Sequence, residues 1–366
     1  MPDYPEHIHK LSPYVPGLAI DTLAKELGLS PDAIVKVASN ENPLGPSELA
    51  KQALAELPSE IALYPDNDSV GLTAAIAEYH KVPPEWVVVG SGSEAVLSMA
   101  AVSLLTHGRQ TVYSQYSFQA FAGAAQRVGA TKVVVPSPDF RVDLEGLLAA
   151  INVDTALVYI ANPGNPTGTF ISSDEIEAFL KQVPEQVVVL LDEAYFEYLT
   201  ERDRPRSVDL VRAYPNLLVT RTFSKAYGLA GLRVGYGIAQ PSVADMLRRV
   251  RAPFSVTRMA QIAATAALRD KDFLAKTVKS NDIGLQYLYE SFDKLGLKYV
   301  RSHANFVLVD VGDGVQMSQR LNRRGVIVRP LKSYAMNEWI RISVGNADEN
   351  EKVIAALAKE LGEKKR

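Results

Sequence analysis

The sequence contains no cysteine among its 366 residues. Disulfide bonds, thiolate metal sites and a cysteine nucleophile are therefore excluded. Histidine is scarce as well, and no metal site is expected because the five residues show no ligand spacing: His7, His9, His80, His107 and His303. The net charge of −3 is far from the basic excess that nucleic acids or anionic membranes attract, so neither is expected as a partner.

Long apolar runs are missing too. No stretch approaches the roughly 20 residues that a membrane-spanning helix requires. Residues 1–10 are polar and lack the apolar core of a signal peptide. A cytoplasmic location without a membrane partner is the expectation. The apolar fraction of 47% is ordinary for a globular protein, and the length suffices for one large domain and a smaller one.

Short β-branched runs alternate with helical patterns between residues 86 and 220. This alternation predicts an α/β fold with a mostly parallel sheet covered by helices. A long helical stretch follows Pro241, and three short strands and a C-terminal helix come after it, which predicts a smaller α+β domain. We therefore expect three parts: an N-terminal arm of residues 1–37 that joins the small domain, a large domain of residues 38–240, and a small C-terminal domain of residues 241–366.

One lysine stands in an unusual setting. Lys225 is followed by small and apolar residues, 226–232, which should partly desolvate its amine, lower its pKa and provide a neutral nucleophile for imine formation with a carbonyl. Thr222, Ser224 and Arg233 offer the hydroxyl donors and the guanidinium that suit a phosphate. Pyridoxal phosphate is an aldehyde that carries a phosphate, so this stretch points to it. The alternative is a glycine-rich turn with an incidental lysine.

A second candidate phosphate site is the turn 90–95, between an expected strand and an expected helix. Its GSGSEA sequence formally fits the dinucleotide fingerprint. The acidic residue that should follow about 20 positions later is absent, because residues 108–135 contain no Asp or Glu. A nicotinamide-dependent oxidoreductase is therefore disfavoured. Backbone N–H groups at a helix start suit any phosphate, and a turn without a ligand is the alternative.

Three further residues follow expected strand ends, where open α/β sheets place ligands. Asp192 can pair with a protonated pyridine nitrogen, which makes the ring an electron sink, or serve as a helix N-cap or as half of a metal-binding pair with Glu193. Asn165 is a candidate donor to a ligand oxygen, although its Pro- and Gly-rich surroundings first indicate a loop. Phe118 can stack on a flat ring or belong to the core.

Two arginines interrupt or end apolar strands. Arg341 stands between Ile340 and Ile342, and Arg329 follows residues 326–328. Each either faces outward by strand alternation or clamps a carboxylate. The residues alone leave both interpretations open.

With these residues assembled, the chain resembles the histidinol-phosphate aminotransferase family, which belongs to the fold type I pyridoxal-phosphate-dependent aminotransferases. The resemblance covers nearly the whole chain. It rests on motifs in family-like order, at residues 12–17, 40–43, 64–66, 165–168, 192–195, 224–233 and 328–341. It departs from common family forms at Ser91, where arginine is frequent, and at Tyr116, where proline is frequent.

The resemblance implies a role for each matching residue. Lys225 would bind the cofactor covalently, with Asp192 at the pyridine nitrogen and Tyr195 at the phenolic oxygen. Further implied cofactor contacts are Asn165 at the phenolic oxygen, Phe118 on the ring face, Ser93, Glu94, Thr222, Ser224 and Arg233 at the phosphate, and Tyr64 at the phosphate in the neighbouring subunit. Implied substrate contacts are Arg341 for an α-carboxylate, Arg329 for a substrate phosphate or a side-chain carboxylate, and Tyr14 and Asn40 for closing the site.

The resemblance also implies an activity and an assembly. The activity is ping-pong transamination between histidinol phosphate and 2-oxoglutarate in histidine biosynthesis, carried out by a homodimer with shared active sites. An aromatic amino-acid aminotransferase and a threonine-phosphate decarboxylase on the same scaffold are the alternatives. A cofactor-binding regulator would carry an added DNA-binding region, and the residues before Ala38 are too few and too proline-rich to supply one.

Overall fold

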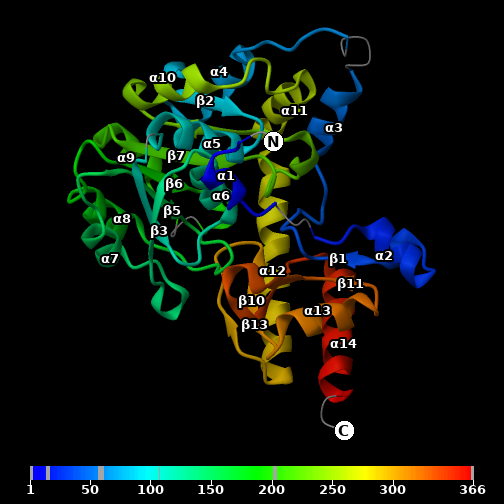
Figure 1. Ribbon diagram of the computed structural model, residues 1–366. Helices are drawn as coiled ribbons and strands as arrows, with labels where there is room; N and C mark the ends of the chain where they lie inside the picture. Colours follow the sequence, from blue (N-terminus) through cyan, green and yellow to red (C-terminus); the bar gives the residue numbers. More distant parts are fainter. Residues whose placement is uncertain (1–2, 14–16, 57–61, 107, 201–203, 364–366) are drawn as a thin grey trace.

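The computed structural model describes residues 3–13, 17–56, 62–106, 108–200 and 204–363. Two bodies lie one above the other in Figure 1, and a long helix, α12 (Lys271–Leu295), runs from the upper body into the lower one. Leu274, in the first turn of α12, packs on the core of the large body, whereas Leu288 and Phe292 belong to the core of the small body. One helix is therefore shared by both bodies.

A seven-stranded sheet forms the centre of the large body, in the order β2-β8-β7-β6-β5-β3-β4. All neighbouring strands are parallel except β8, which is antiparallel to both β2 and β7. The bounds are β2 (Val87–Gly90), β3 (Gln110–Ser114), β4 (Thr131–Val135), β5 (Thr155–Ala161), β6 (Val188–Asp192), β7 (Leu217–Thr222) and β8 (Gly235–Ile238). The mostly parallel sheet confirms the predicted architecture.

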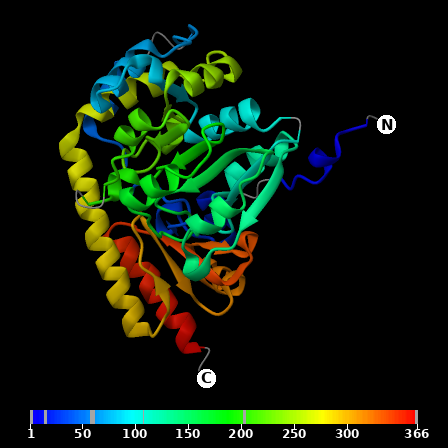
Figure 2. The same cartoon turned by 90° about the vertical axis from the view of Figure 1, so that its left-hand side faces the viewer.

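Helices cover both faces of this sheet, as Figures 1 and 2 show. One face carries α3 (Glu48–Ala55), α4 (Val70–His80), α7 (Leu144–Ala149), α8 (Ser173–Leu180), α9 (Ser207–Ala213) and α11 (Arg258–Arg269); the other carries α5 (Ser93–Leu104), α6 (Gln119–Arg127) and α10 (Pro241–Val250). Along β6, Val189 and Leu191 enter one core and Val188 and Leu190 enter the other. A strand buried on both faces must be apolar throughout, which explains the unbroken apolar run.

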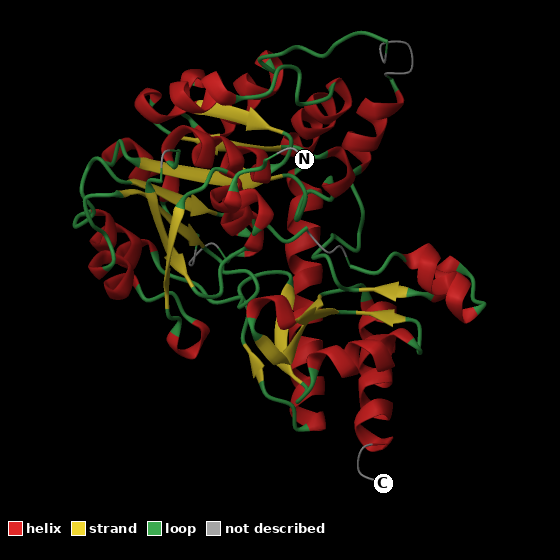
Figure 3. Ribbon diagram, viewed as in Figure 1, coloured by secondary structure: helices red, strands yellow, loops and turns green. Residues whose placement is uncertain are grey.

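The small body contains an antiparallel sheet in the order β12-β13-β10-β9. Its strands are β9 (Tyr299–Val300), β10 (Phe306–Asp310), β12 (Arg329–Leu331) and β13 (Met336–Ser343), and its core is shared with α13 (Gly314–Asn322), α14 (Ala347–Glu363) and α12. Figure 3 shows these helices beside the yellow strands of the lower body. The helical stretch expected after Pro241 is divided into α10, α11 and α12.

The N-terminal segment contacts both bodies. Its strand β1 (Val35–Lys36) pairs in parallel with β11 (Val326–Ile327), and α2 (Ile20–Leu27) packs beside this pair. The first helix, α1 (Glu6–His9), lies instead on α6, where Gln126 Nε2 donates to the His7 carbonyl at 2.9 Å. Short 3-10 turns complete the structure: η1 (Pro31–Ala33), η2 (Pro84–Trp86), η3 (Pro138–Phe140), η4 (Phe196–Tyr198), η5 (Ala230–Leu232) and η6 (Lys332–Tyr334). In the described part of the chain, no helix combines the length and the apolar character needed to cross a bilayer.

Candidate active site

Several of the predicted site residues meet at one edge of the large sheet. Asp192 is the last residue of β6 and Thr222 the last of β7, while Asn165 follows the end of β5 and Lys225 lies three residues beyond β7. Because these parallel strands end at the same edge, the loops that follow them converge there. These residues thus meet at the edge of the sheet where the sequence placed them, and their roles in a site stay a prediction.

Asp192 is buried and held by two hydroxyl groups. Tyr159 donates to its Oδ2 and Thr220 to its Oδ1, each at 2.9 Å. Burial raises the pKa of the Asp192 carboxyl, and the hydrogen bonds from Thr220 and Tyr159 partly oppose this rise. Two neutral donors orient the carboxylate without neutralising it, so a cationic ring nitrogen is a suitable further partner.

The amine of Lys225 donates to the backbone carbonyl of Ser39 at 3.0 Å. Burial, together with the charges of Arg341 and Arg233, lowers the pKa of Lys225 to about 8, while the charge of Glu41 opposes this fall. The direction is the one expected from the sequence. The two arginines add a cause that the residues next to Lys225 do not reveal.

The hydroxyl of Tyr195 accepts two hydrogen bonds, from Asn40 Nδ2 at 2.8 Å and from Asn165 Nδ2 at 3.1 Å. A phenol has one proton to donate and two lone pairs to accept. With both lone pairs used, its proton is directed to a third group. Burial raises the pKa of Tyr195 to about 12, so the phenol is neutral at physiological pH and remains a donor.

Arg341 connects this cluster to the small body. Its Nη1 donates to Asn165 Oδ1 at 2.6 Å and its Nη2 to the carbonyl of Ala38 at 2.8 Å. The side chain thus faces the site rather than solvent, which settles the orientation that the sequence left open. Arg329 on β12 is the register partner of Arg341 on β13.

A cradle for an anion lies at the start of α5. Helix α5 has no side-chain cap, so its first N–H groups, at Ser93 and Glu94, are suited to an anion. Arg233 Nη1 donates to Ser224 Oγ at 3.3 Å. Gly92, with φ of 82°, lets the guanidinium approach, because a Cβ there would lie 2.7 Å from Arg233 Nη2.

The surroundings of four other predicted residues differ from one another. Tyr64 is 81% exposed and stacks on Phe254, with ring centroids 4.8 Å apart. Phe118 is half-buried at the start of α6, after β3. Tyr14 lies outside the described residues. Asn40 is fully buried beside Tyr195, with φ of 55°.

Four further residues, which the sequence did not single out, contact the site residues or lie next to them. Thr220 is the cross-strand partner of Asp192, and a hydroxyl inside an apolar strand was the available signal. On the opposite face of the sheet, Arg221 and Glu193 form a buried ion pair at 2.9 Å, to which Ser207 also bonds. Their positions next to Thr220 and Asp192 follow from strand alternation.

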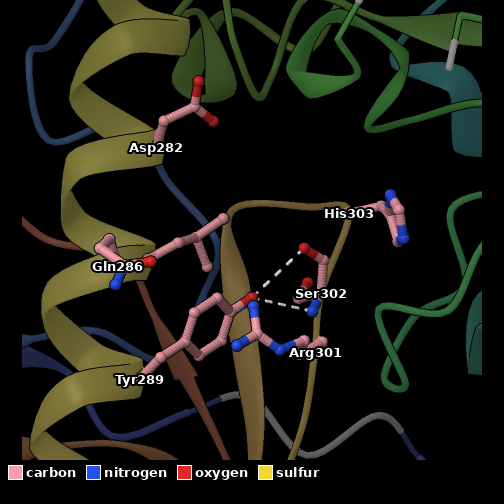
Figure 4. A pocket seen from close by; sticks show the side chains of 7 residues that line it. Asp282, Gln286, Tyr289, Arg301, Ser302 and His303 are labelled. Carbon is pink, nitrogen blue, oxygen red and sulfur yellow. Dashed lines mark hydrogen bonds between the residues drawn. The ribbon is translucent and has the colours of Figure 1, made fainter. Parts of the chain in front are cut away.

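A separate hollow lies between α12 and residues 301–303 (Figure 4). There the Tyr289 hydroxyl accepts from the Ser302 N–H at 2.9 Å, and the Arg301 guanidinium lies 5.0 Å from the Tyr289 ring centre. His303 N–H donates to the carbonyl of Gly168 at 2.8 Å. Among the described residues, no group of three or more His, Asp or Glu side chains is placed to bind a metal ion.

Comparison with known proteins agrees with this geometry. The family model "Aminotransferase class I and II" matches residues 32–357. A histidinol-phosphate aminotransferase 1 of Cupriavidus pinatubonensis is 49% identical over 365 residues, covering 99% of this chain and 97% of the relative. A histidinol-phosphate aminotransferase 2 of Ralstonia nicotianae is 48% identical over 363 residues, covering 98% and 97%.

A solved structure agrees as well. The histidinol-phosphate aminotransferase of Sinorhizobium meliloti, in complex with pyridoxal-5'-phosphate, matches with a TM-score of 0.87 and 30% identity, over 98% of each chain. The fold and the site thus define a class I and II aminotransferase. Within that class, the chain belongs to the histidinol-phosphate aminotransferase family, as the resemblance predicted.

Proposed function

We propose that this protein is a pyridoxal-phosphate-dependent aminotransferase that moves the amino group of histidinol phosphate to 2-oxoglutarate, in histidine biosynthesis. The products are imidazole acetol phosphate and glutamate. The observation that carries the proposal is the convergence of Lys225, Asp192, Tyr195, Asn165 and Arg341 in one cluster. The names of relatives that cover nearly the whole chain supply the substrate.

The residues fit pyridoxal phosphate. Lys225 would hold it covalently, Asp192 would face its ring nitrogen, and Tyr195 and Asn165 its phenolic oxygen. The phosphate would lie at the cradle of Ser93, Glu94, Thr222, Ser224 and Arg233, and Phe118 would stack on the ring. The bound cofactor supplies an electron sink for the electrons of a broken C–H bond.

The chain's own groups would then divide the work. Lys225, with its pKa lowered to about 8, would have a larger fraction of neutral amine near pH 7 than a free lysine, and this amine would act first as a nucleophile and then as a general base at the substrate α-carbon. Asp192 would stay anionic beside the cofactor's ring nitrogen and would hold a proton on that nitrogen. Tyr195 would donate its free proton to the cofactor's phenolic oxygen, because its lone pairs are already used.

Substrate recognition would depend on the two arginines. Arg341 would exchange its bonds to Asn165 and Ala38 for the α-carboxylate of 2-oxoglutarate or glutamate. Arg329, on the neighbouring strand, would meet the phosphate of histidinol phosphate or the side-chain carboxylate of glutamate. Asn40 and, from the arm, Tyr14 would help to close the site.

A homodimer with shared sites is part of the proposal. Leu63, Tyr64 and Phe254 expose 68%, 81% and 44% of their surface, an apolar group that suits burial against a second copy. Tyr64 would then reach the neighbouring cofactor phosphate. The division into an arm, a large domain and a small domain at residues 37 and 240, and the cytoplasmic location, likewise remain predictions.

An absorbance spectrum of the purified protein, followed by borohydride reduction and peptide mapping, tests the cofactor assignment. A reduced adduct on Lys225 is expected, and an adduct on any other lysine would contradict it. Comparing kcat/KM for histidinol phosphate, phenylalanine, tyrosine and threonine phosphate tests the donor. Higher kcat/KM for phenylalanine would favour the aromatic aminotransferase, and turnover of threonine phosphate with loss of CO₂ would favour the decarboxylase.

A further inference from the structure

Three side chains of β13 point from the small body toward the large body. Trp339, Arg341 and Ser343 alternate along the strand and therefore share one face, while Ile340 and Ile342 are buried in the small-body core. Ser343 Oγ donates to Asn40 Oδ1 at 2.8 Å, and Arg341 Nη1 donates to Asn165 Oδ1 at 2.6 Å. Each of these two contacts has an evident place in the site described above.

The third side chain, Trp339, contacts a different group of residues. Its ring meets the ring of Phe140 edge to face, with centroids 4.9 Å apart, and Phe140 in turn lies 5.7 Å from Tyr116. Phe140 belongs to η3 of the large body. All three rings are half-buried. The contact therefore joins the two bodies on the side of Arg341 opposite to Ser343.

The backbone that presents Phe140 is unfavourable. Asp139 and Phe140 both have positive φ, at 50° and 63°, a region that aspartate tolerates but that is strained for a bulky aromatic residue. Such a conformation persists only where its surroundings enforce it. Here the Phe140 carbonyl accepts from Thr169 Oγ1 at 3.1 Å, and Thr169 Oγ1 lies 2.9 Å from Thr167 Oγ1.

These contacts connect Trp339 indirectly to Arg341. Thr167 and Thr169 belong to the same loop as Asn165, and Asn165 is the partner of Arg341. Trp339 contacts Phe140, and Phe140 is bonded to the loop that carries Asn165. Asn165 in turn bonds to Arg341, which lies two residues from Trp339 on β13. A second contact, from Gln119 Nε2 to the carbonyl of Ser333 at 2.6 Å, reinforces the same side of the junction between the bodies.

We infer that Phe140 and Trp339 are positioning residues for Arg341: their contact holds the outer part of β13 against the large body, so that the guanidinium meets a substrate carboxylate. The inference rests on the proposed role of Arg341 as the carboxylate clamp. Neither ring touches the reacting atoms. Their effect should appear in carboxylate binding rather than in the proton transfer by Lys225.

The chain permits a direct optical test, because it contains only two tryptophans, Trp86 and Trp339. Trp86→Phe, in the large body next to β2, leaves Trp339 as the only indole. Holoenzyme of this variant is titrated with succinate, an unreactive dicarboxylate, while Trp339 emission is followed. We expect a saturable change in emission, and in this background Phe140→Ala should raise the succinate Kd about tenfold, as misplacement of a clamp does.

Kinetics of the holoenzyme supply the second measurement. Phe140→Ala and Trp339→Ala should raise KM for 2-oxoglutarate about tenfold with kcat changed less than about threefold, the pattern of lost substrate binding. Trp339→Phe keeps an aromatic ring and should restore nearly normal KM. Tyr299→Ala is the matched control, since it removes a half-buried ring stacked on Tyr289 elsewhere in the small body, and should leave KM unchanged.

The outcomes separate this inference from the proposed function. If Arg341→Ala does not weaken succinate binding, the clamp itself is wrong. If Arg341→Ala weakens binding but Phe140→Ala leaves Kd, and both Phe140→Ala and Trp339→Ala leave KM, within twofold of the parent, the positioning role is wrong. If an alanine variant fails to fold, Trp339→Phe and Phe140→Leu decide: a normal KM for the first and a raised KM for the second support the role of the ring contact, and equal KM values overturn it.

Discussion

Arg341 Nη1 donates to Asn165 Oδ1 at 2.6 Å, although 176 residues separate the two in sequence. The same amide donates a hydrogen bond from its Nδ2 to the hydroxyl oxygen of Tyr195. One side chain therefore contacts both the proposed carboxylate clamp and the proposed partner of the cofactor's phenolic oxygen. A carboxylate that binds Arg341 must compete with this amide oxygen.

Asn165→Asp should make that competition much harder for the substrate. A carboxylate in place of the amide would form an ion pair with Arg341, stronger than the present hydrogen bond, and would lose the donor to Tyr195. We expect KM for 2-oxoglutarate to rise by about 10- to 100-fold, and more than in Asn165→Ala, which leaves Arg341 accessible. Steady-state kinetics of both variants measure this difference, and a lower KM in Asn165→Asp than in Asn165→Ala would contradict it.

Lys225→Met should stabilise the apoenzyme near neutral pH. Burial lowers the pKa of Lys225 to about 8 in the folded protein, against about 10.4 when unfolded. Below pH 8 both states carry the proton, so the full penalty of burying the charge is present, on the order of 3 kcal/mol. Between pH 8 and about 10.4 the unfolded state binds more protons, and the stability of the parent rises with pH.

Urea unfolding of the two apoenzymes at pH 6.5, 8 and 9.5 measures this effect. The free energy of unfolding of Lys225→Met should exceed that of the parent at pH 6.5, and the difference should shrink as the pH rises. A difference that is constant with pH would show that the lysine is not buried as a charge. The variant should also have no measurable transamination.

Gly92→Ala should weaken cofactor binding. A Cβ at Gly92 would lie 2.7 Å from Arg233 Nη2, and the φ of 82° is unfavourable for alanine. The guanidinium must then move away from the start of α5, and we expect the Kd for pyridoxal phosphate to rise by about 10-fold or more. Gly71→Ala in α4 is the matched control, because nothing lies within 4 Å of its Cβ. Equilibrium dialysis that finds equal Kd values for the two variants would refute the cradle.

Shared active sites predict complementation between two inactive variants. Lys225→Ala lacks the amine, and Tyr64→Ala lacks the side chain that we place in the neighbouring site. A heterodimer of the two contains one site with both native residues, so mixing and subunit exchange should restore up to about half of the activity per heterodimer. Activity after exchange, compared with each variant alone, measures this. No recovery despite heterodimers detected by differential tagging would mean that Tyr64 acts within its own subunit or not at all.

Strand ends predicted which residues meet at one edge of the sheet, because parallel strands bring their carboxyl ends to one edge whatever the loops do. Asp192, Asn165 and Lys225 could be placed in this way. Strand β8 was missed because Gly235 and Gly237 conceal the strand pattern. Glycine is required at position 235 by a contact with a distant segment, since a Cβ there would lie 2.3 Å from the Ser93 nitrogen.

Other features depended on contacts between distant segments. Neither the two amides at the Tyr195 hydroxyl nor the bond from Lys225 to the Ser39 carbonyl has a local signal. The orientation of Arg341 was undecidable from alternation, because both faces of β13 are covered: one by the small-body core and one by the large body. Such residues require the packing of the two bodies to be known.

The shared helix α12 has a consequence for the chemistry. Lys225 belongs to the large body and Arg341 to the small one. The distance between the amine and the guanidinium is therefore set partly by α12, a helix of 25 residues that is about 37 Å long. Each residue of an α-helix turns the chain by about 100°. A single residue inserted midway along α12 would therefore swing the small body around the helix axis and separate the two groups, although every residue of the site remained in place in the sequence.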